Sequence, residues 1–147
     1  MPDFVHNPPV PGRLQPILLA VLRAVTGALF MQHGVQKLFG LLLPADRTWN
    51  GAPELLSQMW FAGVLETFGG ALILVGLLTR PVAFLLAGQM AVAYFQAHAP
   101  RDFWPILNGG EHTVLFCFIF LSLCVAGAGP YSVDAARFGR RDAARAS

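Results

Sequence analysis

Glu66 lies within a run of twenty residues, Met59 to Leu78, whose other side chains are uncharged and mostly apolar. As a helix with a rise of about 1.5 Å per residue, such a run is long enough to span a hydrocarbon layer of about 30 Å. An ionisable group at that depth costs about 2.5 kcal/mol or more, so it requires a partner or a chemical task. The run therefore predicts a membrane helix with a polar group that faces protein rather than lipid.

The composition extends this prediction to the whole chain. Of the 147 residues, 55% are hydrophobic and 12% are charged, which is about half the charged fraction of a soluble domain. Apolar segments of helical length recur, whereas a membrane β-barrel would show alternating strands of about ten residues. The segments are residues 17–39, 59–78, 82–99 and 113–128. The predicted fold is an all-α integral membrane protein, a four-helix transmembrane antiparallel bundle.

The connections and the basic residues predict an orientation. Thr79, Arg80 and Pro81 separate the second and third apolar segments, which predicts a tight helical hairpin with Pro81 in the first turn of the third helix. Basic residues favour the cytoplasmic side of a membrane. One side holds six of them and the other side holds three: Arg13, Arg80, Arg137, Arg140, Arg141 and Arg145 against Lys37, Arg47 and Arg101. We therefore expect a multi-pass protein of the bacterial inner membrane with both termini in the cytoplasm.

These boundaries divide the chain into three parts. We expect an amino-terminal cytoplasmic segment at residues 1–13, a membrane domain at residues 14–135 and a basic cytoplasmic tail at residues 136–147. The first apolar segment is too long for a secretory signal, so we expect it to be retained. The net charge of +2 is too small, and the basic residues are too dispersed, to indicate a nucleic-acid partner.

Polar side chains on three of the predicted helices lie at similar depths. His33, Glu66 and Gln89 come about 9 to 15 Å below the outer ends of their helices, at 1.5 Å per residue. On the first helix, Gln32, His33, Gln36 and Lys37 cover an arc of about 140° and form one polar face. On the third helix, Gln89 and Gln96 share one stripe, and Tyr94 and His98 share nearly the opposite stripe. The pattern predicts a polar interior near the outside.

Each of these residues also has a structural interpretation. Glu66 either pairs with Lys37 or His33 to fix the helix register, or it exchanges protons and binds a ligand. Lys37 either joins the site or extends outward to water. His98 either caps carbonyl groups at the end of its helix or faces a ligand. Arg23 lies on the cytoplasmic half of the first helix and is expected to anchor carbonyl groups or Asp134, with binding of an anionic lipid as the alternative.

Metal and disulfide sites are weaker alternatives. His33, Glu66, His98, Glu111 and His112 are all possible ligand types, but they lack a short spacing such as H-E-x-x-H. We therefore predict no metal site. Cys117 and Cys124 are seven residues apart on one predicted helix, about 10 Å along its axis, so they cannot bridge each other. They are predicted to be packed core residues.

Six motifs together resemble the DoxX family of small four-helix bacterial inner-membrane proteins. They occur in the order His33 to Lys37, Glu66 to Gly70, Gly76 to Arg80, His98, Asn108 to Glu111, and Ser132 to Ala135. The resemblance implies an association with membrane redox chemistry, because the family is named after the small subunit of a thiosulfate:quinone oxidoreductase. Many members have no assigned activity. The resemblance therefore favours a quinone function without establishing it.

The sequence-based hypothesis is a quinone-associated accessory subunit of an oxidoreductase system. His33 and Glu66 would hydrogen-bond the quinone carbonyl oxygens and exchange protons, which makes them the candidate catalytic residues. The cofactor-binding candidates are His33, Gln36, Lys37, Glu66, Gln89, Tyr94 and His98. No ligation pattern for haem, flavin or an iron–sulfur cluster is evident, so electrons would come from a membrane or periplasmic redox partner. We also expect a homo-oligomer or larger complex within the lipid bilayer.

A second hypothesis comes from another functional class. The chain would be a non-enzymatic membrane scaffold or a small-molecule permeation unit that binds its partner through the outer loops. Phe103, Trp104 and Pro105 would then form the contact surface.

Overall fold

The computed structural model describes residue 12 and residues 14–137, and within these residues the secondary structure is helical with no strand. The expected amino-terminal segment and most of the arginine-rich tail lie outside the described residues. The elements are α1 (Leu14–Phe39), α2 (Gln58–Val64), η1 (Leu65–Gly69), α3 (Gly70–Val75), α4 (Thr79–Ala93), η2 (Tyr94–His98), α5 (Pro105–Asn108) and α6 (Glu111–Ala126). A helical turn at residues 133–137 follows α6.

Two of these helices contain a wider, π-helical turn. The segments α2, η1 and α3 follow one another directly and form one stretch from Gln58 to Val75, and α4 continues into η2 in the same way. In η2 the amide of Ala99 donates to the carbonyl of Tyr94, five residues back, at 2.9 Å. Single π-helical turns inside α-helices are rare and are frequent at functional sites. Here they contain Glu66 in η1 and His98 in η2.

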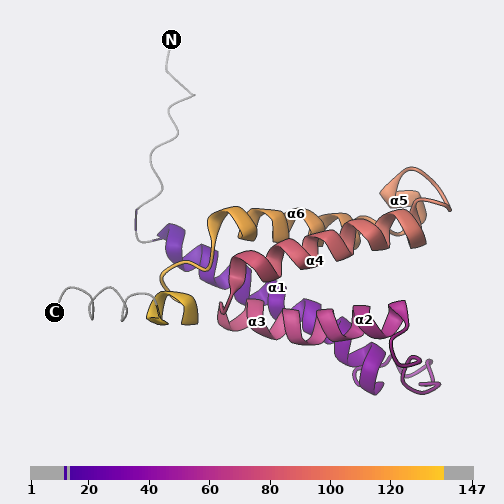
Figure 1. Cartoon of the computed structure of the whole chain (residues 1–147). Coiled ribbons are helices and arrows are strands. Elements are labelled where there is room, and N and C mark those ends of the chain that lie inside the picture. The colour runs from indigo at the N-terminus through magenta and orange to yellow at the C-terminus, as the bar shows by residue number, and fades with distance from the viewer. Residues whose placement is uncertain (1–11, 13, 138–147) are drawn as a thin grey trace, which may run out of the picture.

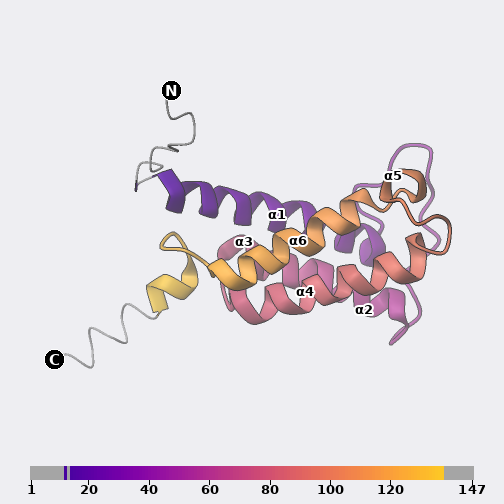
Figure 2. The same ribbon diagram turned by 90° about the horizontal axis from the view of Figure 1, so that it is seen from above.

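The helices pack as two pairs that run side by side. Helix α1 packs along α2, η1 and α3, whereas α4 packs along α6, and Figures 1 and 2 show both pairs from two directions. The first pair is close because it meets through glycine. A Cβ atom at Gly27 would lie 2.5 Å from the amide nitrogen of Leu74, so a larger residue would push the helices apart.

A tight turn lies at one end of the molecule, and two longer connections lie at the other. The turn from α3 to α4 is Gly76 to Leu78, in which Gly76 and Leu78 both have left-handed backbone angles. The second helix therefore ends earlier and the third begins earlier than the sequence predicted, although Pro81 does lie in the first turn of α4. We call this the hairpin end, and we call the opposite end, with residues 40–57 and 99–110, the loop end (Figure 1).

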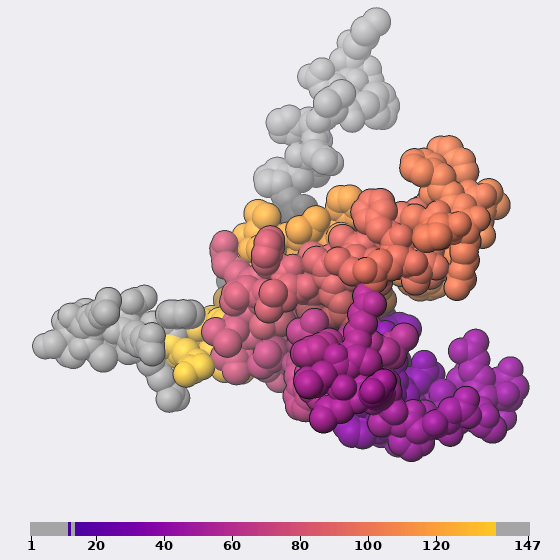
Figure 3. Space-filling view, turned by 45° about the vertical axis from the view of Figure 1, so that its right-hand side comes forward, coloured from indigo at the N-terminus to yellow at the C-terminus, as the bar shows by residue number. Residues whose placement is uncertain are grey.

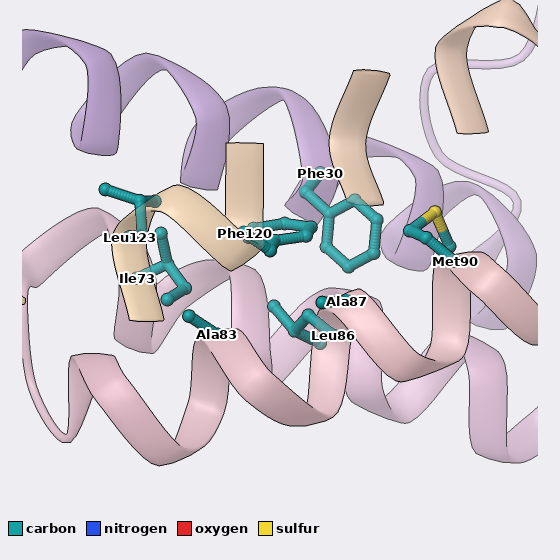
Figure 4. Packing of buried hydrophobic residues seen from close by; sticks show 8 residues of the cluster. All are labelled: Phe30, Ile73, Ala83, Leu86, Ala87, Met90, Phe120 and Leu123. Carbon is teal, nitrogen blue, oxygen red and sulfur yellow. The ribbon is translucent and has the colours of Figure 1, made fainter. Parts of the chain in front are cut away.

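The hydrophobic core joins the two pairs of helices near the middle of the molecule. Figure 4 shows the rings of Phe30 of α1 and Phe120 of α6 next to each other, and their centroids are 4.8 Å apart in an edge-to-face arrangement. Ile73 and Leu86 are fully buried beside them. Cys117 and Cys124 are free thiols packed against this core, as predicted.

Two helical stretches of the described chain are long and apolar enough to cross a membrane: Leu14–Phe39 and Gln58–Val75. Helix α6 is apolar but shorter. Large apolar side chains remain exposed along the outer faces of the helices. On α1, for example, Leu18 is 61% exposed, and on α6 Val125 is 77% exposed. Such faces suit lipid rather than water.

Candidate functional site

A cavity of about 850 Å³ opens between the two helix pairs toward the loop end. In Figure 3 the two lobes project apart at this end, with the segment around α2 on one side and the segment around η2 and α5 on the other. Phe30 and Met90 belong to the core and also line the cavity. The floor of the cavity is therefore the part of the hydrophobic core that lies toward the loop end.

The cavity wall is mainly apolar and carries a limited set of polar side chains. Apolar contacts come from Phe30, Met59, Phe61, Leu65, Leu85, Met90, Val92 and Phe116, among others. The polar side chains are His33, Lys37, Ser57, Gln58, Glu66, Gln89, Gln96, His98 and Thr113. Its size and its mixture of apolar walls with a few polar groups are typical of a small-molecule site.

The central feature of the wall is an ion pair between α1 and η1. Lys37 Nζ lies 2.5 Å from Glu66 Oε1. The Glu66 side chain is 2% exposed, whereas that of Lys37 is 32% exposed. The pair therefore consists of a buried carboxylate and an ammonium group that reaches the cavity or the surface.

Gln89 of α4 connects the Lys37–Glu66 ion pair to the helix pair formed by α4 and α6. Its Nε2 donates to Glu66 Oε1 at 3.0 Å and to the carbonyl of Ala62 at 3.4 Å. The carboxylate of Glu66 thus connects side chains from α1, η1 and α4. One side-chain oxygen of Glu66 and one of Gln89 have no hydrogen-bond partner among the described residues, namely Glu66 Oε2 and Gln89 Oε1.

His33 lies on the same wall and is exposed. Its ring meets Phe116 of α6 edge-on, with centroids 6.1 Å apart. Among the titratable side chains that line the cavity, His33 is the exposed one, and its ring packs against Phe116.

His98 is held from two sides by the segment that precedes and begins α6. Its Nδ1 lies 3.2 Å from the carbonyl of Asn108, which can only accept, so Nδ1 carries the proton. Its Nε2 then accepts from Thr113 Oγ1 at 3.3 Å. His98 lines the cavity while both ring nitrogens are occupied, which is close to the structural role weighed for it from the sequence.

Gln96 and Gln58 close one side of the cavity. Gln58 Nε2, at the start of α2, donates to Gln96 Oε1 in η2. This hydrogen bond connects the two pairs of helices at the surface. Neither Gln58 nor Thr113 was selected from the sequence, because each lies beside other polar residues at a helix start, where polar side chains are common.

Of the predicted site residues, Tyr94 and Gln36 lie outside the cavity wall. The hydroxyl group of Tyr94 donates to the carbonyl of Phe103 at 2.8 Å and accepts from Asn108 at 3.3 Å, so Tyr94 holds the loop before α6. Gln36 donates to the carbonyl of Leu42 at 3.0 Å, just beyond the end of α1. The structure brings together His33, Lys37, Glu66, Gln89 and His98.

Arg23 and Asp134 form a separate cluster at the hairpin end. Arg23 is 3% exposed and donates to the carbonyls of Ile73, Leu74 and Tyr131 at 2.5 to 2.7 Å. Asp134 accepts from the amides of Leu78 and Thr79 at 2.9 and 3.0 Å, at the start of α4. The anchoring role that the sequence suggested for Arg23 is thus confirmed.

Comparisons with known proteins found one family model and one curated relative that match most of the cavity-lining part of the chain. The DoxX family model matches residues 18–99 of the chain, which include every ionisable or amide residue of the ion-pair network. An uncharacterized protein of Haemophilus influenzae is 38% identical over 127 residues, which are 83% of this chain and 92% of that protein. No solved structure matches the chain. Among the described residues, no group of three or more His, Cys, Asp or Glu side chains could hold a metal ion.

Proposed function

The chain belongs to the DoxX family, and on that premise we propose that it is a quinone-associated accessory membrane subunit of an oxidoreductase system. The observation that carries the proposal is the cavity of about 850 Å³, in which an ion pair and a histidine face mainly apolar walls. The apolar walls suit the ring and chain of an isoprenoid quinone. The polar residues suit its head group.

The membrane arrangement is part of the same proposal. Four helices would cross the bilayer: α1, the stretch from α2 to α3, the stretch from α4 to η2, and α6. The exposed apolar faces of α1 and α6 support this arrangement. Contact with lipid is favourable for such side chains, whereas their exposure to water is unfavourable. The inner membrane is the compartment that fits a bacterial quinone.

Both termini would lie in the cytoplasm, because six basic residues precede the first apolar segment, separate the second from the third or follow the fourth, against three on the other side. To test this, Cys117 and Cys124 are first replaced by alanine, and single cysteines are then placed at Ala52 and Ser147. An impermeant thiol reagent added to intact cells should label Ala52→Cys and spare Ser147→Cys. Labelling of Ser147→Cys would reverse the proposed orientation.

Within the cavity, proton exchange is the chemistry that the side chains support. A quinone takes up two protons with two electrons on reduction, so acid and base groups beside its head group serve the reaction. Glu66 is buried and held by Lys37, and His33 is open to the cavity. A membrane or periplasmic redox protein would supply the electrons, and the chain itself would supply binding and protons.

The decisive experiment is the quinone content of the gently purified protein. We expect a stoichiometric quinone in the lipid extract, and we expect its loss from Glu66→Gln. Gln36→Ala is the matched control, because Gln36 belongs to the same motif as Lys37 but lies outside the cavity wall. Wild-type protein without any quinone, purified together with its partner proteins, would reject the proposed function.

A non-enzymatic scaffold is the second candidate, and exposed residues at the loop end favour it. Around α5, Phe103 is 77% exposed, Trp104 61%, Ile106 73% and Leu107 68%. In this case a partner protein should co-purify with wild type and be lost from Phe103→Ser/Trp104→Ser, while the lipid extract holds no specific quinone. Mass measurement in nanodiscs would show at the same time whether the native particle is a homo-oligomer or a larger complex.

A further inference from the structure

Two buried oxygen atoms beside the cavity have no hydrogen-bond donor. They are Glu66 Oε2 and Gln89 Oε1, and neither has a partner among the described residues. Both residues line the cavity, and the Glu66 side chain is 98% shielded from solvent, since only 2% is exposed. A buried acceptor without a donor is unfavourable, because it has lost its hydrogen bond to water. A ligand that donates a hydrogen bond would replace it.

The neighbouring side chains fix which atoms remain free. Gln89 Nε2 faces two acceptors, Glu66 Oε1 and the carbonyl of Ala62, so the amide nitrogen must point at them and the amide oxygen must point elsewhere. Lys37 donates to Oε1 of Glu66, the same oxygen that Gln89 uses. Both known donors therefore converge on one oxygen and leave the other carboxylate oxygen and the amide oxygen as acceptors.

We propose that the cavity holds the reduced, dihydroxy form of its ring ligand, the quinol, more tightly than the quinone. This inference rests on the proposed function. The carbonyl oxygens of a quinone only accept hydrogen bonds, so they cannot satisfy Glu66 Oε2 or Gln89 Oε1. The hydroxyl groups of a quinol donate, and one such bond to either oxygen supplies the missing partner. Phe30, Met90 and Phe116 offer apolar contact to the ring of either form.

The preference has a consequence for the electron transfer. Quinone, two electrons and two protons give quinol, with the electrons supplied by the redox partner of the proposed function. A site that binds the product tenfold more tightly than the substrate raises the reduction potential of the bound couple by about 30 mV. The cavity would thereby make the bound quinone easier to reduce.

The test compares one short-chain benzoquinone with its own hydroquinone. Each is titrated anaerobically into the purified full-length protein in nanodiscs, and binding is measured by equilibrium dialysis. We expect the hydroquinone to bind about tenfold more tightly, because one charge-assisted or buried hydrogen bond is worth about 1.4 kcal/mol. Gln89→Met should reduce this ratio several-fold.

Gln96→Met is the matched control for Gln89→Met. Gln96 lies seven residues further along the same helical stretch and also lines the cavity, but its Oε1 already accepts from Gln58. Its removal should leave the ratio unchanged. Thermal unfolding of each variant shows that the fold is retained.

The outcomes separate this inference from the proposed function. If neither form binds wild-type protein, the proposed function fails and the preference fails with it. If the quinone binds as tightly as the hydroquinone or more tightly, the proposed function stands and the preference is wrong. The wild-type ratio alone decides this, so the test does not depend on any variant.

Discussion

The hairpin end and the loop end use buried polar side chains in different ways. At the hairpin end, Arg23 and Asp134 bind only backbone groups, the carbonyls that end α3 and the amides that begin α4. Toward the loop end, Lys37 and Gln89 both bind the Glu66 carboxylate, side chain to side chain. Lys37 lies in the last turn of α1, whereas Glu66 and Gln89 lie in the middle of continuous helical stretches. Helix ends in a protein interior must be satisfied, whereas the middle of a helix already satisfies its own backbone.

This difference separates a structural requirement from an added property. The hairpin end without Arg23 would leave carbonyl groups without donors in a dry environment. The loop end without Glu66 would still have complete helices. The backbone of these helices does not require the polar network at the cavity, which is why we propose it as a site.

The largest effect should follow from Arg23→Met. Methionine keeps much of the volume but donates nothing to the carbonyls of Leu74 and Tyr131, so we expect a loss of about 3 kcal/mol in the free energy of unfolding. Thermal unfolding in nanodiscs measures it. Arg80→Met is the control, because Arg80 lies at the same end and is exposed, and the substitution removes the same charge. Equal destabilisation by both variants would show that net charge, and not backbone anchoring, matters at the hairpin end.

Asp134→Asn should have the next largest effect. Both carboxylate oxygens accept backbone amides at the start of α4, and asparagine retains only one acceptor oxygen. We expect a loss of about 1 to 2 kcal/mol, as for other helix caps. The control is Asp102→Asn, in which the single accepting oxygen that binds the amide of Trp104 is preserved. A normal unfolding temperature for Asp134→Asn would contradict the capping role.

Local patterns predicted a helical hairpin with Pro81 in the first turn of α4, although the turn itself lies earlier than predicted, and they were only partly sufficient for the cavity. The length of each apolar run, the proline in the first turn of α4 and the depth of Arg23 all follow from helix geometry. The cavity depends on the turn at η2. A regular step of about 100° per residue puts His98 nearly opposite Gln89 and Gln96, yet all three line the cavity. The wider turn from Tyr94 to His98 changes that step, and no residue type predicts it.

Pairing within the cavity depended on contacts between helices, which a single sequence does not give. Lys37 and His33 were both possible partners for Glu66, and the structure selects Lys37. Gln36 was predicted beside Lys37 on a polar face of α1, but that face extends beyond the cavity. Its amide instead binds the carbonyl of Leu42, in the turn after α1.

Glu66→Gln should change stability little while it abolishes quinone binding. A fully buried ion pair would cost about 3 kcal/mol or more on losing one partner. Here the Lys37 side chain is 32% exposed, so its ammonium group can turn toward water. We expect a loss of less than about 1 kcal/mol in unfolding free energy, with quinone content and unfolding measured on the same preparation. A large loss of stability would make the network at the loop end structural, and the two ends would then be alike.

The smallest effect should come from Gln36→Ala. This variant tests whether the site at the loop end is defined by the network around Glu66 or by position in the sequence. Gln36 is adjacent to Lys37 and forms part of the same motif on α1, so a role based on sequence position alone would predict a loss of quinone. The structure gives it one hydrogen bond, to a carbonyl group in an exposed turn. Water can replace that bond, so we expect a change within about 0.5 kcal/mol in unfolding free energy and unchanged quinone content. Loss of quinone from Gln36→Ala with normal unfolding would mean that the ligand extends past the cavity wall to the end of α1. The site would then be defined by the polar face of that helix rather than by the network centred on Glu66.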